Sequence, residues 1–237
     1  MSATRAAILA AVRAALGRPQ AAPDGSPPTS TPAAPLATPA APLAAPLPAR
    51  PAVRPPRQPG PQAQEIERLL AEVRLLSGAA EALPAAATGA ALARLVSAEG
   101  VRRASVCETP LLQRLDIAGQ LRTLGVELAP PTADKHTLAG CDLGVTEADF
   151  ALPETGTLGL LAGERQPRAV SLLPRLHLAL LTPAVLRADL HQVLAEARRQ
   201  PYLVLISGPS RTADIELTVT LGVHGPKQLA VWMIIDG

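Results

Sequence analysis

Hydrophobic and polar positions along the chain change their spacing twice. Near the start, apolar residues recur at helical intervals, which predicts a helix over residues 2–17 that ends at Gly17. Residues 18–62 hold 15 of the 26 prolines, and neither helix nor sheet propagates through such a segment. We expect an extended linker there, with an SH3-type ligand as the alternative. The pattern becomes globular from residue 63, so residues 63–237 are expected to form the main domain.

Helical and strand-like patterns alternate through this main domain. Helices are expected at residues 65–76, 85–99, 110–124, 184–199 and 213–219. In the helix at 184–199, Thr182 is the expected cap and Leu186, Leu190 and Leu194 form the buried stripe. Strands are expected at residues 104–107, 126–129, 143–150, 157–162, 169–172, 177–181, 202–207 and 228–235. This alternation predicts an α/β fold, with a Rossmann-like, mostly parallel sheet flanked by helices and ligand sites at the carboxyl ends of its strands.

Composition narrows the function classes. Hydrophobic residues make up 48% of the chain but aromatic residues only 1%, which argues against modules that stack single-stranded nucleic acid on aromatic rings. A net charge of +2 is too small to indicate a polyanion partner, so no nucleic-acid partner is expected. Arg5 and Arg13 interrupt the first apolar runs, and no stretch is long and apolar enough to span a bilayer. We therefore expect a cytoplasmic location.

The two cysteines, Cys107 and Cys141, do not form a C-x-x-C pair. They cannot by themselves supply an ordinary four-cysteine zinc or iron–sulfur site. Cys107 lies in an apolar stretch and is interpreted as a small buried hydrophobe, while a disulfide between the two cysteines stays open. We expect no metal ligands in this chain.

The most informative segment is SGPSRTADIE at Ser207–Glu216, which follows an apolar strand. Gly208 permits a sharp turn, and the free N–H groups at the start of the expected helix attract anions. Arg211 has the geometry to clamp a carboxylate or phosphate. The alternative is that the polar residues of this segment only cap a helix: Ser210, Thr212, Asp214 and Glu216.

Three shorter segments carry candidate side chains. Glu154 stands beside a glycine turn at Glu154–Thr157 (ETGT), where it can act as a base or nucleophile, or remain a solvated surface residue. His224 lies between two glycines at Gly222–Pro226 (GVHGP), where it can serve acid–base chemistry or simply cap a turn. The segment Ser171–Pro174 (SLLP) is interpreted on physical grounds as the end of a strand.

Taken in order, ETGT, SLLP, GPSRTADIE and GVHGP resemble the lactate-utilization (LUD) domain family, most closely the lactate utilization protein C branch. The resemblance is strong from about residue 144 to residue 234, and the proline-rich segment departs from it. It implies a fold similar to the ribose-isomerase, glucosamine-phosphate-isomerase and CoA-transferase group. The resemblance does not settle the chemistry of this subunit. From these motifs we take Glu154 and His224 as catalytic candidates, and as ligand-binding candidates Thr155, Gly156, Thr157, Ser171, Gly208, Ser210, Arg211, Thr212, Asp214 and Glu216.

The resemblance also implies a role in the oxidation of L-lactate to pyruvate with two partner proteins that carry the iron–sulfur clusters. This chain is then a non-redox subunit that binds no cofactor and takes a small carboxylate or phosphorylated ligand, or docks a partner. Two alternatives remain: a free-standing isomerase- or CoA-transferase-like enzyme that uses Glu154, and a binding or regulatory module. Whether this subunit is itself catalytic is left open by the sequence.

Overall fold

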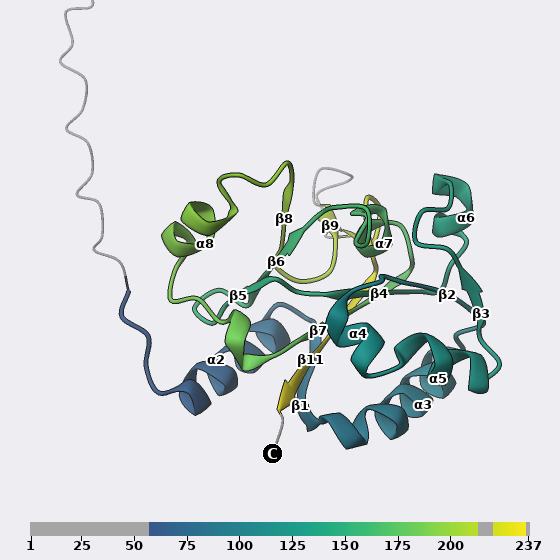
Figure 1. Ribbon diagram of the computed structural model, residues 1–237, viewed down its shortest axis with the longest axis horizontal. Helices are drawn as coiled ribbons and strands as arrows, with labels where there is room; N and C mark the ends of the chain where they lie inside the picture. The colour runs from purple at the N-terminus through teal and green to yellow at the C-terminus, as the bar shows by residue number, and fades with distance from the viewer. Residues whose placement is uncertain (1–56, 213–219, 236–237) are drawn as a thin grey trace, which may run out of the picture. The chain divides into compact units, whose positions relative to one another are not determined.

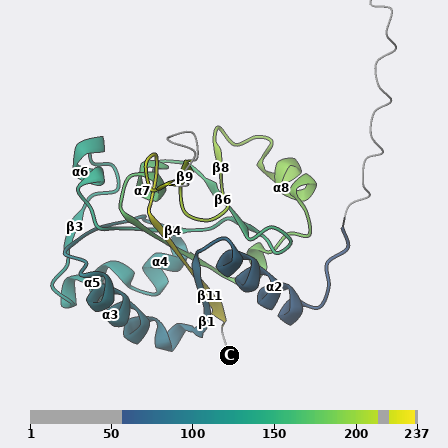
Figure 2. The ribbon, with the colours of Figure 1, turned by 180° about the vertical axis from the view of Figure 1, so that it is seen from behind.

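The computed structural model describes residues 57–212 and 220–235 (Figures 1 and 2). The helix expected at 2–17, nearly all of the linker and the helix expected at 213–219 lie outside the described residues. The helices are α2 (Gln62–Leu75), η1 (Ala85–Ala87), α3 (Thr88–Glu99), α4 (Pro110–Arg114), α5 (Ile117–Thr123), α6 (Lys135–Ala139), α7 (Ala169–Leu172), η2 (Pro183–Val185) and α8 (Leu190–Ala197). The strands are β1 (Ala79–Pro84), β2 (Arg103–Val106), β3 (Glu127–Ala129), β4 (Leu143–Glu147), β5 (Phe150–Leu152), β6 (Thr157–Leu161), β7 (Leu176–Leu181), β8 (Leu203–Ile206), β9 (Arg211–Thr212), β10 (Thr220–Leu221) and β11 (Gln228–Ile235).

The main sheet has six parallel strands in the order β1-β11-β7-β4-β2-β3. Its central strand β7 is buried along its whole length, as expected of a parallel sheet covered on both faces. From β2 the chain goes to β3 on one side and then to β4 on the other, so the strand order reverses between β2 and β4. This arrangement confirms the predicted α/β fold.

Side chains on alternate positions of the strands enter two separate cores. On one face, α2 contributes Leu69, Leu70 and Val73 to a cluster with Ala179 and Val231. On the other face, α3, α4 and α5 pack on a cluster that includes Leu178 and Trp232. Figures 1 and 2 show α2 on one side of the sheet and α3, α4 and α5 on the other.

A smaller antiparallel sheet, β5-β6-β8, extends from the end of β4. Phe150 and Leu152 on β5 pack against Val193 and Ala197 on α8. A two-stranded antiparallel pair, β9 with β10, follows β8. These elements carry the loops that the sequence marks as functional.

Two elements near the middle of the chain differ from those predicted from the sequence. The helix expected at 110–124 is divided into α4 and α5, because Asp116 adopts a left-handed conformation with φ of 47° and its carboxylate caps α5 by accepting from Gly119 N. The strand expected at 169–172 is the one-turn helix α7 instead. Its backbone passes so close to β4 that a Cβ on Gly144 would lie 2.0 Å from Val170 O.

The helix expected at 184–199 is also shorter. Arg187 N donates to Ala151 O at 2.9 Å, which holds the chain extended after η2. Asp189 rather than Thr182 then caps α8 by accepting from Gln192 N. As a result Leu190 and Leu194 are exposed, while Val193 and Ala197 are buried. Strands β1 and β5 and helix α6 were not separately predicted.

Within the described ranges, no helix is long and apolar enough to cross a bilayer.

Candidate functional site

The Glu154–Thr157 turn joins β5 to β6 and rests on α2. Gly156 has φ of 61°, and a Cβ there would lie 2.8 Å from Val73 N. A glycine is therefore required both by the backbone conformation and by the close approach of the helix. Glu154 and Thr155 project from this turn and are exposed, whereas Thr157 is buried.

The segment after β8 rests on the same helix, at its carboxyl end. Gly208 has φ of 89°, and a Cβ there would lie 2.8 Å from Leu76 O. The guanidinium of Arg211 donates to Leu76 O and to Ser77 Oγ, the latter at 3.1 Å. Arg211 thus ties this loop to the end of α2, and its described contacts are structural.

Three hydroxyl groups connect these two turns. Thr155 Oγ1 lies 2.8 Å from Thr157 Oγ1, which in turn lies 2.7 Å from Ser207 Oγ. All three residues line a hollow of about 770 Å³. Glu154 and Arg57 also line this first hollow, together with Leu152, Ala188, Asp189, Leu190, His191 and Leu205.

Charges around the first hollow are predominantly acidic. Arg57 is hydrogen-bonded to the buried carboxylate of Glu65, which raises the pKa of Arg57 and lowers that of Glu65. The Arg57 backbone N–H donates to Asp189 Oδ2 at 3.0 Å. The guanidinium of Arg57, which is the only one in the lining of this hollow, is therefore already paired with a carboxylate. The negative charges of Glu154 and Asp189 would repel an anionic ligand.

A second, smaller hollow of about 170 Å³ lies beside the first and shares Ser207 and Leu205 with it. Ser171, His177, Gly208 and Ser210 contribute to its lining, which contains no Asp, Glu, Lys or Arg. It lies at the amino ends of β7 and β11, because His177 and Leu229 are the second residues of those strands. This position is opposite to the carboxyl edge that we expected.

His177 lines the second hollow and is fully buried. Its Nε2 lies 2.8 Å from Thr146 Oγ1, and burial lowers its pKa to about 4. The imidazole is consequently neutral near pH 7, a state in which one ring nitrogen donates and the other accepts. From the sequence pattern, this histidine was predicted only to be part of a strand.

The Gly222–Pro226 loop closes one side of the second hollow. Ser210 N donates to Pro226 O at 3.0 Å, and Gly222 N donates to Ser210 O at 3.0 Å. A Cβ on Gly225 would lie 3.0 Å from Ser210 Cβ, so this glycine allows the two loops to touch. His224, in the same loop, is exposed and lines neither hollow.

The family model that matches this chain covers residues 127–234, which include all four motif loops. This segment matches the LUD domain family. A solved structure of a DUF162 family protein from Deinococcus radiodurans superimposes with a TM-score of 0.58 at 21% identity, covering 75% of this chain and 100% of that chain. That likeness supports the fold.

Curated relatives match the same part of the chain. Lactate utilization protein C of Halalkalibacterium halodurans is 42% identical over 103 residues, and that of Shouchella clausii is 37% identical over 102 residues. The uncharacterized protein YkgG of Escherichia coli is 40% identical over 102 residues. Each alignment covers 40% of this chain and 44% of the relative, so the chain spans less than half the length of these relatives.

The site residues predicted from the sequence are distributed over several places. Glu154, Thr155 and Thr157 line the first hollow, while Ser171, Gly208 and Ser210 line the second. Thr212 pairs with Thr220 in the β9–β10 ribbon, and Asp214 and Glu216 lie outside the described residues. Glu154, Arg211 and His224 do not share one hollow.

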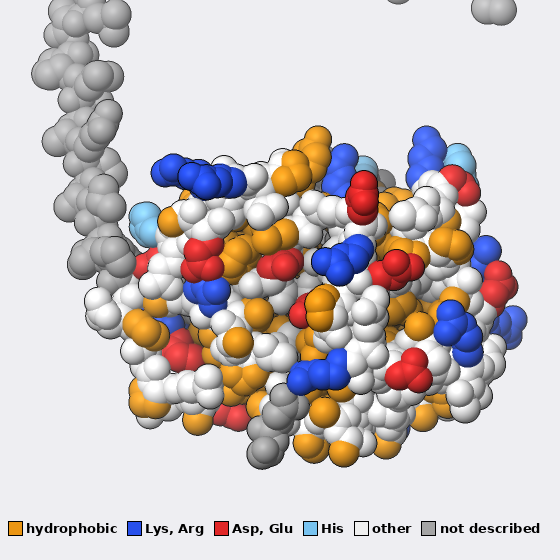
Figure 3. Space-filling view, in the orientation of Figure 1, with side chains coloured by type: hydrophobic (Ala, Val, Ile, Leu, Met, Phe, Trp, Pro, Cys, Tyr) orange, Lys and Arg blue, Asp and Glu red, His pale blue; other side chains and the backbone are white. Residues whose placement is uncertain are grey.

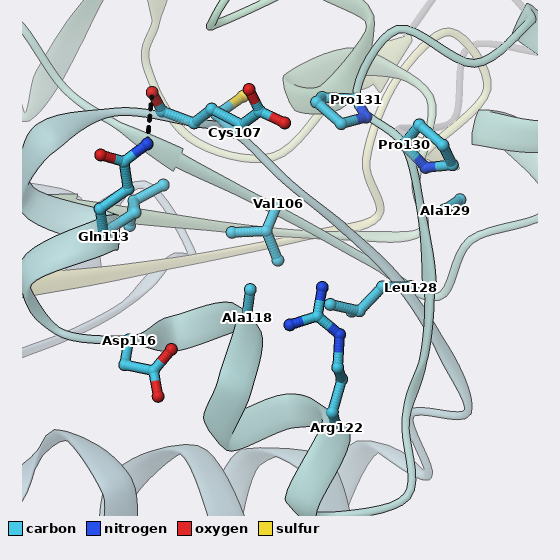
Figure 4. A pocket seen from close by; sticks show the side chains of 12 residues that line it. Val106, Cys107, Gln113, Asp116, Ala118, Arg122, Leu128, Ala129, Pro130 and Pro131 are labelled. Atoms are coloured by element: carbon cyan, nitrogen blue, oxygen red, sulfur yellow. Dashed lines mark hydrogen bonds between the residues drawn. The ribbon is translucent and has the colours of Figure 1, made fainter.

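A third hollow, of about 430 Å³, lies at the carboxyl ends of β2 and β3 (Figure 4). Cys107 lines it, and burial raises the pKa of this thiol to about 12.

Cys107 and Cys141 are both buried and both free, so the described structure has no disulfide between them. In the portion of the chain that is described, no three Asp, Glu, His or Cys side chains are grouped as metal ligands. Acidic and basic side chains are interspersed on the face shown in Figure 3.

Proposed function

We propose that this chain serves lactate utilization as a subunit that binds a small carboxylate and carries no redox cofactor of its own. The observation that carries the proposal is the match of residues 127–234 to the LUD family, with relatives named lactate utilization protein C at 37–42% identity. All four motif loops fall inside the matched segment. The cytoplasmic location predicted from the sequence belongs to the same proposal.

Iron–sulfur subunits are the proposed partners. Oxidation of L-lactate to pyruvate removes two electrons and two protons, so the system needs an electron acceptor. This chain has two cysteines, fewer than an ordinary iron–sulfur cluster requires. Both thiols are buried, and burial raises the pKa of each, which disfavours the thiolate form that ligates iron. The clusters that accept the electrons are accordingly assigned to the partners.

The second hollow suits the carboxylate better than the first. Its lining places the hydroxyl groups of Ser207 and Ser210 and the buried imidazole of His177 around a small space without a carboxylate. Hydroxyl groups can donate to a carboxylate oxygen, whereas the first hollow would oppose it with Glu154 and Asp189. We assign the small ligand to the second hollow.

Growth on L-lactate tests the role of the chain. Deletion of its gene from the source organism should abolish growth on L-lactate but not on a sugar, and the full-length gene should restore it. Affinity purification of the full chain should recover cysteine-rich iron–sulfur proteins. Unchanged growth after deletion would overturn the proposal.

Binding to the isolated chain tests the site. Titration calorimetry with L-lactate and with pyruvate should show saturable binding that Ser210→Ala weakens, because this change removes one hydroxyl donor from the second hollow. Thr155→Ala, which removes an exposed hydroxyl of the first hollow, is the matched control. Equal weakening by both variants would contradict the assignment to the second hollow.

A free-standing enzyme of the isomerase or CoA-transferase kind is the second candidate. It is favoured by one observation: Glu154 is exposed in the first hollow beside a row of three hydroxyl groups. Turnover of an acyl-CoA or sugar phosphate by the isolated chain, lost in Glu154→Gln, would support it. A pure binding or regulatory module would instead keep its function in Glu154→Gln and His224→Gln.

A further inference from the structure

A hollow of about 650 Å³ lies where the strand order reverses, between the carboxyl ends of β2 and β4. Open α/β sheets commonly bind ligands at such a reversal, because the connecting chains diverge to opposite faces there. Thr109 follows β2, and Glu147 and Asp149 stand at the end of β4. None of these three residues lines any of the three hollows described above.

The carboxylates of Glu147 and Asp149 are held in place by neighbouring groups. Leu111 N donates to Glu147 Oε2 at 3.1 Å, and Leu161 N donates to Asp149 Oδ2 at 2.7 Å. Gln166 links the two residues, because its Oε1 accepts from Glu147 N and its Nε2 donates to Asp149 Oδ2. These bonds use one oxygen of each carboxylate.

The charged side chains that line this hollow are mostly acidic. Burial and the charge of Glu147 raise the pKa of Asp149, while hydrogen bonds from Leu161 and Gln166 lower it, and the main contributions include no cationic side chain. Arg165 is the only basic residue of the lining, which also includes the acidic Glu164. An anion is disfavoured here, and a cation would gain from both carboxylates.

Thr109 supplies an independent observation at the same place. The residue is 9% exposed and lines the hollow, and its Oγ1 has no hydrogen-bond partner in the described chain. A buried hydroxyl without a partner is uncommon in folded proteins because the loss of its hydrogen bonds to water costs about 1–3 kcal/mol. A donor placed in the hollow would satisfy its oxygen.

We propose that this hollow binds a small aliphatic amine, whose ammonium group donates to Glu147, Asp149 and the Thr109 hydroxyl. An ammonium group has three N–H donors and one positive charge, which match two carboxylate oxygens and a hydroxyl oxygen. Pro110 and Leu161 offer apolar contacts to the alkyl part. A bare metal ion fits less well, because the described residues contain no group of three metal-ligating side chains.

Titration of the full chain with 1,4-diaminobutane tests this site. We expect saturable binding, weakened about tenfold or more in Glu147→Gln and in Asp149→Asn. Glu67→Gln removes a carboxylate from the exposed face of α2 and should leave the affinity unchanged. Thr109→Val should weaken binding without loss of thermal stability, since its hydroxyl has no protein partner to lose.

Three results would overturn the proposal. These are the absence of saturable binding up to about 10 mM amine, equal weakening by Glu67→Gln, and binding of Mg²⁺ that requires Glu147 and Asp149 while the amine does not bind. Asp149→Asn keeps an oxygen acceptor for Leu161 N, so we expect this variant to fold. If it does not fold, the affinity of Thr109→Val for the amine tests the proposal instead. The site is separate from that of the proposed carboxylate, so either proposal can fail alone.

Discussion

Thr157 Oγ1 and Ser207 Oγ lie 2.7 Å apart although the two residues are separated by 50 positions in the sequence. This hydrogen bond joins the turn between β5 and β6 to the loop after β8 in the first hollow. Because Thr157 also contacts the Thr155 hydroxyl, its side chain is the middle member of the row. We therefore expect a conservative substitution at Thr157 to lower the free energy of unfolding more than one at the end of the row.

Replacement of Thr157 by valine keeps the shape of the side chain but removes both hydrogen bonds. We expect the free energy of unfolding to fall by about 1–2 kcal/mol, since the buried Thr157 side chain loses its hydrogen bonds to Thr155 and Ser207. Thr155→Val changes an exposed hydroxyl at the end of the same row and should cost less. Urea denaturation of the three proteins measures the difference, and an equal cost for both variants would contradict the central place of Thr157.

The glycines of the two motif turns should be far less tolerant than a glycine elsewhere. Gly156→Ala and Gly208→Ala introduce a Cβ at positive φ and within 2.8 Å of backbone atoms of α2 and of the residue that follows it. We expect each to destabilise the fold by about 2–4 kcal/mol. Gly163→Ala is the control, because a Cβ there meets nothing within 4 Å. Melting temperatures of the three variants test this contrast.

Some of these relationships could be predicted from the sequence and others could not. The continuous apolar runs of β7 and β11 predict buried parallel strands correctly, because such strands are covered on both faces. β1 was missed because its sequence, rich in alanine with one glutamate, has little strand propensity and forms a strand only by pairing with β11. Tertiary pairing of this kind leaves no local pattern.

The candidate site was likewise predicted correctly only in part. The glycines of ETGT and GPSR were correctly singled out as turn residues, since positive φ favours glycine. Arg211 was predicted to clamp an anion, but its guanidinium binds Leu76 O, a group 135 positions away in sequence. Local sequence can indicate that an arginine has donors to offer, but not which acceptor the fold brings to it.

Arg57 should be important for stability although it stands at the edge of the described chain. Its guanidinium pairs with the buried Glu65 carboxylate, and its backbone N–H donates to Asp189, the cap of α8. Arg57→Met should cost about 2–3 kcal/mol, because it leaves Glu65 buried without its partner. Arg94→Met removes an exposed pair with Glu81 at 3.8 Å and should cost less than about 0.5 kcal/mol. Chemical denaturation measures both values, and equal costs would contradict this role.

His177 should make the stability of the domain fall as the solution is acidified. Its folded-state pKa is lowered to about 4 by burial, whereas the unfolded chain binds the proton near its ordinary pKa of about 6.5. The neutral imidazole therefore contributes full stability above about pH 6.5, and this contribution declines as the pH falls toward 4, by about 3 kcal/mol in total. The carboxylates of the domain add their own pH dependence, so the comparison must be made between variants.

His177→Gln isolates the contribution of the histidine, because glutamine can bond Thr146 Oγ1 but does not titrate. The difference in free energy of unfolding between wild type and His177→Gln should change by about 3 kcal/mol between pH 7 and pH 4, in the direction that disfavours wild type in acid. Urea denaturation across this range measures the difference. A pH-independent difference for His177→Gln would mean that burial does not lower the pKa of the imidazole in the folded domain, and hence that water reaches His177.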